Sequence, residues 1–121
     1  MIKSKIYKLK RVIQFLSCEI PIKFIKFVEF PHFVGITISS KTKIGTNCII
    51  YANVTIGGKK NGGKEFPKIG NNVKIYSNSV IIGKIKIGNN VIIGAGSVVL
   101  SDIDDNCIVV GNPAKVIKQV K

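Results

Sequence analysis

Branched aliphatic residues recur every six positions through most of the chain. They occupy Ile38, Ile44, Ile50 and Ile56 and then, after a break, Ile69, Ile75, Ile81, Ile87, Ile93 and Val99. Six is not a multiple of the 3.6-residue period of an α-helix, so these residues do not mark one face of a helix. A short self-similar period is typical of a parallel β-helix, in which each unit adds a strand and a corner to a solenoid.

The repeat predicts which side chains face the interior. We expect the recurring aliphatic residues to point inward and to stack on their counterparts in the next coil. The position four residues later is mostly small or β-branched, and it should fill the narrower interior sites. These residues are Thr42, Cys48, Val54, Val73, Ser79, Val91 and Ser97. Glycine often follows the aliphatic residue, and Asn71–Asn72 and Asn89–Asn90 should occupy corners, where asparagine tolerates a left-handed backbone.

The N-terminal segment, residues 1–21, has a helical period instead. Apolar residues recur at steps of three and four, and Pro21 should end the helix. The apolar positions are Ile2, Ile6, Leu9, Ile13 and Leu16, and the basic ones are Lys3, Lys5, Lys8, Lys10 and Arg11. Two compatible interpretations follow: the apolar stripe caps the open end of the solenoid, and the basic face rests on an anionic membrane surface.

The remaining chain divides into a solenoid and a tail. The solenoid should cover residues 22–110, and residues 111–121 form a C-terminal tail. The step from Ile56 to Ile69 is thirteen residues, and the segment 57–68 between them is rich in glycine and lysine. We therefore expect this segment to loop out of the solenoid.

Composition and charge narrow the setting. The 121 residues fit one domain, and the formal net charge of +13 indicates an anionic partner without selecting its class. No apolar run is long enough to span a membrane, and the basic start lacks a clean secretory signal. Cys18, Cys48 and Cys107 have no CxxC spacing, which favours reduced thiols in the cytoplasm over disulfides or zinc.

Two C-terminal motifs add a family resemblance. The segments 93–99, Ile-Gly-Ala-Gly-Ser-Val-Val, and 111–117, Gly-Asn-Pro-Ala-Lys-Val-Ile, resemble the hexapeptide-repeat acyltransferases. The resemblance covers roughly residues 30 to 118 and is strongest to serine acetyltransferase and its sugar- and polysaccharide-modifying relatives. It implies a left-handed parallel β-helix, a homotrimer, and acetyl-CoA as co-substrate without a metal.

His32, the one histidine of the chain, is the candidate catalytic residue. Its segment, His32-Phe33-Val34-Gly35-Ile36-Thr37-Ile38, resembles the family pattern His-x-x-Gly-Ile-x-Ile/Val, in which the histidine is the general base. Imidazole can accept a hydroxyl proton near neutral pH. His32 also lies six residues before Ile38, a repeat position, so the simpler interpretation is a packed histidine in a coil. The family Asp that orients the ring corresponds to Ser17 here, which leaves Glu19, Glu29 or a backbone carbonyl for that task.

The resemblance also suggests where acetyl-CoA binds. The loop after Val54-Thr55-Ile56 resembles the family loop that walls this site, which makes candidates of Gly57, Gly58, Lys59 and Lys60, although a solvated loop is the alternative. Backbone at Ser77 and Ala95 would line the pantetheine groove; the two are eighteen residues apart, one full coil. Lys115 is a candidate for binding the phosphates of coenzyme A. The equally plausible alternative is a lysine on a solvent-exposed face that binds no ligand.

The sequence therefore predicts an acetyl-CoA-dependent O-acetyltransferase acting on a hydroxyl of a sugar or polysaccharide precursor. The expected location is the cytoplasm, with peripheral contact at the inner membrane face as a further hypothesis. Serine O-acetyltransferase is the alternative, and a non-enzymatic trimeric scaffold is another. Pro31, Glu65 and Phe66 oppose serine, because they replace an Asp and an Arg-His pair of the family near the amino-acid substrate. One histidine excludes zinc chemistry of the carbonic anhydrase kind. Nucleic acid is not an expected partner, since no stacking-aromatic motif accompanies the charge.

Overall fold

The computed structural model describes residues 2–15, 19–59 and 65–120. Helix α1 (Ile2–Phe15) and a short 3-10 helix η1 (Ile22–Phe24) precede a series of short strands. The strands are β1 (Val28–Glu29), β2 (Thr37–Ile38), β3 (Lys43–Ile44), β4 (Cys48–Ile50), β5 (Thr55–Gly57), β6 (Lys68–Ile69), β7 (Lys74–Ile75), β8 (Val80–Ile82), β9 (Lys86–Ile87), β10 (Ile92–Ile93), β11 (Val98–Val99), β12 (Cys107–Gly111) and β13 (Ala114–Gln119).

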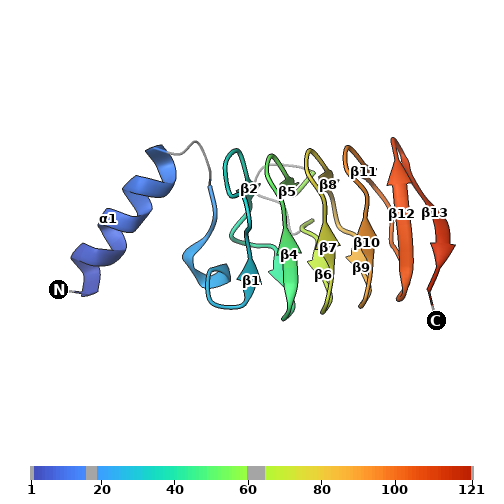
Figure 1. The fold of residues 1–121 in the computed structure, drawn as a ribbon, viewed down its shortest axis with the longest axis horizontal. Helices are drawn as coiled ribbons and strands as arrows, with labels where there is room; N and C mark the ends of the chain where they lie inside the picture. Colours follow the sequence, from blue (N-terminus) through green and yellow to red (C-terminus); the bar gives the residue numbers. More distant parts are fainter. Residues whose placement is uncertain (1, 16–18, 60–64, 121) are drawn as a thin grey trace.

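The strands form the three sides of a solenoid whose coils advance along one axis (Figure 1). We call the sheet β1-β4-β7-β10-β12-β13 the long sheet, β11-β8-β5-β2 the second sheet and β3-β6-β9 the lysine sheet. Neighbouring strands pair in parallel, except that β13 folds back antiparallel on β12. The predicted parallel β-helix is therefore present.

The six-residue repeat forms the core as predicted. Each repeated aliphatic residue from Ile38 to Val99 is buried, with an exposed fraction of 9% or less. The smaller residues four positions later are buried as well. The hydroxyl groups of Ser79 and Ser97 both donate to the carbonyl oxygen of Gly94, at 3.0 and 2.6 Å. The buried Thr42 hydroxyl, in contrast, finds no hydrogen-bond partner among the described residues.

Asparagine ladders hold the corner between the lysine sheet and the long sheet. Asn72 and Asn90 have positive φ there, as predicted, and so do Asn47 and Asn106, which were not predicted. The side-chain amide of Asn72 donates to Asn90 Oδ1 at 3.2 Å, and that of Asn90 donates to Asn106 Oδ1 at 3.1 Å. Each coil therefore fixes the corner of the next one.

The N-terminal end of the core is closed by the segment just before the first coils. Phe24 of η1 is only 2% exposed and joins Ile20 and Val28 in the core. Helix α1 lies beyond this end of the solenoid (Figure 1). In its described part Ile6 and Leu9 remain 41% and 44% exposed. Phe24 therefore contributes to closing the core at this end, and the capping role of the helix stays a prediction. Within the described residues, no helix combines the length and hydropathy required to cross a bilayer.

Candidate active site

His32 lies in an exposed turn, residues 30–36, that joins the long sheet to the second sheet. Two backbone hydrogen bonds fix the turn. Asn53 N of the next coil donates to Val34 O at 3.0 Å, and within the turn the N–H of the buried Ile36 donates to Phe33 O at 3.4 Å. Gly35 has a φ of +72°, and a Cβ at this position would collide with the Asn53 side chain. His32 is therefore not an inward repeat residue; the turn departs from the period and presents the imidazole to solvent.

The same edge of the solenoid carries Ser77 and Ala95. We define the His32 edge as the turns 30–36, 51–53, 76–78 and 94–96, which connect successive strands of these two sheets. Backbone hydrogen bonds link them in sequence, from Asn53 N to Val34 O, from Asn78 N to Ala52 O (3.1 Å) and from Gly96 N to Ser77 O (2.9 Å). Ser77 and Ala95 thus stack on one wall, as their spacing predicts, and this wall continues to the His32 turn.

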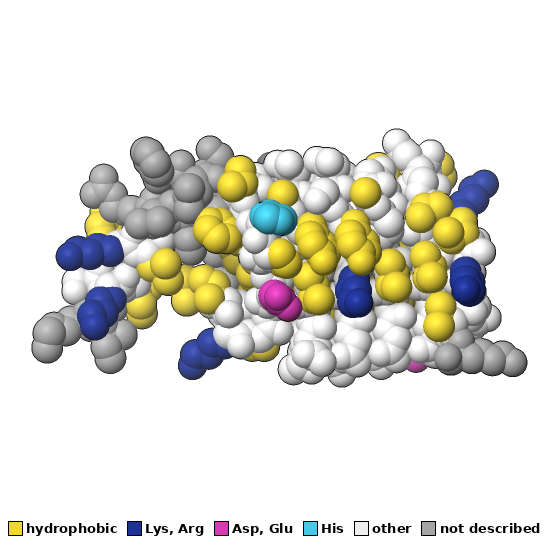
Figure 2. All heavy atoms as spheres, in the orientation of Figure 1, with side chains coloured by type: hydrophobic (Ala, Val, Ile, Leu, Met, Phe, Trp, Pro, Cys, Tyr) yellow, Lys and Arg dark blue, Asp and Glu magenta, His cyan; other side chains and the backbone are white. Residues whose placement is uncertain are grey.

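A stacked pair of tyrosines on this edge was not predicted. The rings of Tyr51 and Tyr76 are nearly parallel, at 9°, with centroids 4.8 Å apart. Each tyrosine directly follows a repeat isoleucine, where several other coils have glycine. The presence of tyrosine in place of glycine at the same repeat position of two coils is the sequence signal that could have revealed the pair. Figure 2 shows the histidine at the border of the hydrophobic band that crosses this face of the solenoid.

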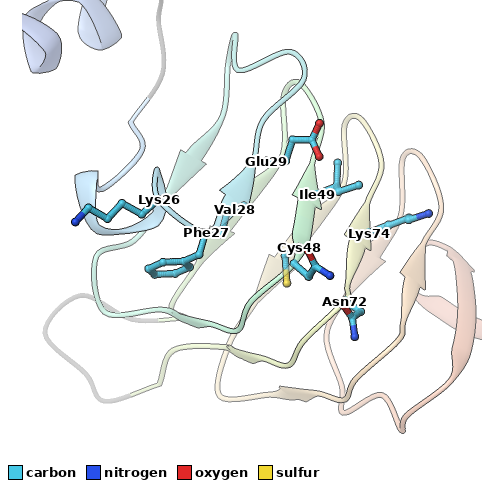
Figure 3. Close-up of a pocket in the computed structure, with 9 residues that line it drawn as sticks. Lys26, Phe27, Val28, Glu29, Cys48, Ile49, Asn72 and Lys74 are labelled. Atoms are coloured by element: carbon cyan, nitrogen blue, oxygen red, sulfur yellow. The ribbon is translucent and has the colours of Figure 1, made fainter.

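Neither glutamate considered as an orienting partner forms a hydrogen bond or ion pair with His32 in the described structure. Glu29 lies on β1, opposite Ile49 of β4, and its carboxylate is exposed (Figure 3). Glu19 is exposed and holds its place through backbone hydrogen bonds with Ile36 and Ile38. Among the described residues, no hydrogen bond or ion pair joins His32 to a carboxylate. Ser17 lies outside the described residues.

The glycine-rich loop begins at another edge. Gly57 ends β5 and pairs with Ile82 of β8. A Cβ on Gly58 would lie 2.9 Å from Glu65 O and from the Phe66 ring, so the two ends of the loop meet there. Lys59 is exposed, and Lys60 lies outside the described residues. Strand β5 separates this site from the His32 edge by roughly 10 Å, at about 3.3 Å per residue.

Lys115 lies at the C-terminal end of the His32 edge. It is exposed on β13 and pairs with Val110 of β12. Val109 O accepts a hydrogen bond from Gly94 N at 2.9 Å, so the end of β12 continues the wall that carries Ala95. Within a single chain, His32, Ser77, Ala95 and Lys115 therefore lie along one edge of the solenoid. The segment from Gly57 to Lys59 lies at the next edge.

The other reactive groups lie away from this edge. A groove of about 460 Å³ extends over strands β1, β4 and β7 of the long sheet, and its lining includes Phe27, Glu29, Cys48 and Lys74 (Figure 3). Cys48 is 1% exposed, and burial raises the pKa of its thiol, which opposes formation of a thiolate nucleophile. The described residues contain no group of three His, Cys, Asp or Glu side chains that could hold a metal ion.

Comparison with known proteins agrees with this architecture. A family model described as bacterial transferase hexapeptide (six repeats) matches residues 66–101. A serine acetyltransferase from Synechococcus elongatus is 46% identical over 87 residues, which are 71% of this chain and 36% of the relative. A serine acetyltransferase from Staphylococcus aureus is 45% identical over 89 residues, or 73% of this chain and 42% of the relative. The chain thus spans about two fifths of the length of these relatives.

Solved structures give the same result. The serine acetyltransferase of Neisseria gonorrhoeae superposes with a TM-score of 0.74 at 43% identity, over 78% of this chain and 38% of that one. A serine acetyltransferase from Brucella abortus in complex with coenzyme A has a TM-score of 0.74 at 34% identity, over the same shares. The predicted left-handed β-helix with a short N-terminal helix is confirmed. The solenoid of this chain is a hexapeptide-repeat β-helix similar to that of serine acetyltransferases.

Proposed function

We propose that this chain transfers an acetyl group from acetyl-CoA to a hydroxyl group. The observation that carries this proposal is the single edge on which His32 lies in line with Ser77 and Ala95. His32 would take the proton of the acceptor hydroxyl, whose oxygen attacks the thioester carbonyl carbon. The carbon–sulfur bond then breaks, coenzyme A leaves as the thiolate, and the imidazolium returns the proton to it. Backbone N–H groups would stabilise the tetrahedral oxyanion.

Serine is the first acceptor to test. The relatives and the solved structures described above are serine acetyltransferases. They support serine better than the sugar or polysaccharide hydroxyl that the sequence predicted. Because this chain spans only about two fifths of those relatives, serine acetylation is here a proposal about the solenoid.

A sugar hydroxyl remains the second candidate acceptor, because the residues at the ends of the glycine-rich loop after β5 differ from those expected to bind serine. Phe66 packs against Gly58, and the Lys41 ammonium lies 5.3 Å from the centre of its ring. This places an aromatic side chain where the resemblance leads us to expect a polar, substrate-contacting histidine. Pro31 and Glu65 likewise supply no group that would bind the carboxylate of an amino acid.

We infer that the functional unit is a homotrimer. The outer surfaces of two sheets are largely aliphatic and only partly exposed: Ile49, Ile92 and Ile108 on the long sheet, and Val80, Ile82 and Val98 on the second. The third carries Lys43, Lys68 and Lys86 in register. Contact between the long sheet of one copy and the second sheet of the next would bury both apolar surfaces. It would also bring a neighbour's Gly57–Lys59 segment towards the His32 edge.

The direct test measures thiol release from acetyl-CoA with serine, simple sugars and nucleotide sugars as acceptors. His32→Ala should abolish acceptor-dependent release, while calorimetry still detects coenzyme A binding. Phe33→Ala is the matched control, because Phe33 is a 41% exposed aromatic residue in the same turn and has no proton to exchange. Release with serine supports the first acceptor, and release with a sugar alone supports the second. Absence of both transfer and coenzyme A binding would overturn the proposal in favour of a scaffold.

A further inference from the structure

Helix α1 has an exposed apolar stripe that nothing in the described structure covers. Ile6 and Leu9 lie one turn apart on the helix, and their exposed fractions are 41% and 44%. Tyr7 beside them is 62% exposed. The end of the solenoid does not need this stripe, because Phe24 already closes the core there at 2% exposure. The described part of this amphipathic helix is therefore available to bind another surface.

The positive charge of α1 indicates that the surface it binds is anionic. Lys3, Lys5 and Lys8 are exposed around the stripe, and the sequence 2–15 contains no aspartate or glutamate. Lysine side chains flanking an apolar stripe can bury their aliphatic stems while the ammonium groups remain in the headgroup region of a bilayer. The same charges repel a second copy of the helix, which argues against a helix bundle as the occupant.

We propose that α1 binds flat on an anionic lipid surface, with Ile6 and Leu9 inserted among the acyl chains and the lysines paired with lipid headgroups. At about 1.5 Å per residue the helix is roughly 20 Å long, so it lies on the bilayer and does not cross it. The docking surface is at the end of the solenoid that carries β1 and β2, between which the His32 turn lies (Figure 1). Bound in this way, the chain holds the His32 end near the membrane.

Sedimentation of the full-length chain with lipid vesicles tests the apolar stripe. We expect binding to vesicles of equimolar phosphatidylcholine and phosphatidylglycerol, weak binding to phosphatidylcholine alone, and loss of binding at high salt. Ile6→Ser with Leu9→Ser should weaken binding at least tenfold. The matched control is Val116→Ser with Ile117→Ser on β13, which removes two aliphatic side chains that are 56% and 63% exposed and should bind as wild type. Equal binding to both kinds of vesicle, or no binding by the wild type, would overturn the proposal.

A second pair of variants tests the charges. Lys5→Gln with Lys8→Gln should weaken binding roughly thirtyfold, since each basic residue near an anionic surface contributes about fivefold. Lys43→Gln with Lys68→Gln removes the same charge from the lysine sheet and should leave binding unchanged. Loss of binding in the lysine-sheet variant alone would place the anionic surface there and refute the role of α1.

Two further measurements separate this proposal from folding and assembly. The thermal unfolding midpoint and acetyl transfer to a soluble acceptor should be the same in the helix variants as in wild type, because α1 lies outside the core. Sedimentation velocity should show an unchanged mass for the helix variants without lipid. A reduced mass would mean that α1 packs against another copy of the chain, and the membrane assignment would be wrong.

Discussion

At the scale of single residues, the buried hydroxyl group of Thr42 lowers the stability of the fold because it makes no hydrogen bond within the described residues. Its side chain is fully buried, and its hydroxyl group has no partner among the described residues. Thr42→Val keeps the shape and removes the unpaired polar group, so it should raise the free energy of unfolding by about 1 kcal/mol. Urea unfolding monitored by circular dichroism measures this. Ser79→Ala is the contrasting control and should lower stability, because Ser79 Oγ donates to Gly94 O. A loss of stability in Thr42→Val would indicate that a buried water pairs with the hydroxyl.

Cys48 should make stability sensitive to alkaline pH. Burial raises the pKa of its thiol, and hydrogen bonding to the backbone at Val73 and Asn72 offsets part of that rise. Because the folded pKa lies above the unfolded one, the stabilisation is complete below the unfolded pKa of about 8.5 and is lost as pH rises through the folded pKa. Under reducing conditions, the free energy of unfolding of wild type should fall more steeply above this pH than that of Cys48→Ala. Parallel curves would contradict the assignment.

The sequence predicted interior residues well because their environment follows from the period of the chain itself. Ile38, Ile75 and Val99 are buried wherever the coils stack, whatever else surrounds the solenoid. His32 shows where that reasoning fails. Its position six residues before Ile38 predicts an inward side chain, yet the left-handed Gly35 and the contact with Asn53 turn the segment outward. Such a turn depends on a neighbouring coil, which the local sequence does not reveal.

At the scale of structural elements, the asparagine corners are the repeated device that fixes the coils. Asn90 has a φ of 56° and takes part in two side-chain hydrogen bonds along the ladder. Asn90→Gly loses those bonds and keeps the permitted backbone, whereas Asn90→Ala also strains it. We expect the alanine variant to be the less stable one by about 1 kcal/mol, measured by chemical unfolding. Equal stability of the two variants would mean that left-handed strain is relieved elsewhere in the corner.

The same scale shows which parts of the site were predictable. Ser77 and Ala95 stack because eighteen residues make one coil, and spacing alone predicts this. The Tyr51–Tyr76 pair spans the inserted loop and is therefore 25 residues apart, so the two residues can be matched only by their shared position after a repeat isoleucine. The relation of Gly57 to the His32 edge was also hidden, because it depends on which sheet lies between them. Motif resemblance named Ser77, Ala95 and Gly57 but did not show that Gly57 lies on a different edge from the other two.

At the scale of the whole molecule, the apolar outer surfaces predict assembly. Ile92→Lys places a charge on the outer surface of the long sheet, between Lys74 and Ile108 in register. Val80→Lys does the same on the second sheet. Because a closed ring of like contacts uses both surfaces in every copy, either substitution should convert the trimer to monomer in sedimentation velocity. Lys86→Gln on the lysine sheet should leave the mass unchanged. A wild-type chain that sediments as a monomer would refute the trimer.

The antiparallel strand β13 has a consequence for long-range order. A parallel solenoid ends in a strand with unpaired backbone groups, which can template another strand. Here β13 covers β12 and reverses the strand direction, so the outermost edge no longer matches the first coil of another copy. A variant lacking residues 114–121 would expose β12 at the terminus. We expect this variant to grow end to end into fibrils, which dye binding and electron microscopy would detect.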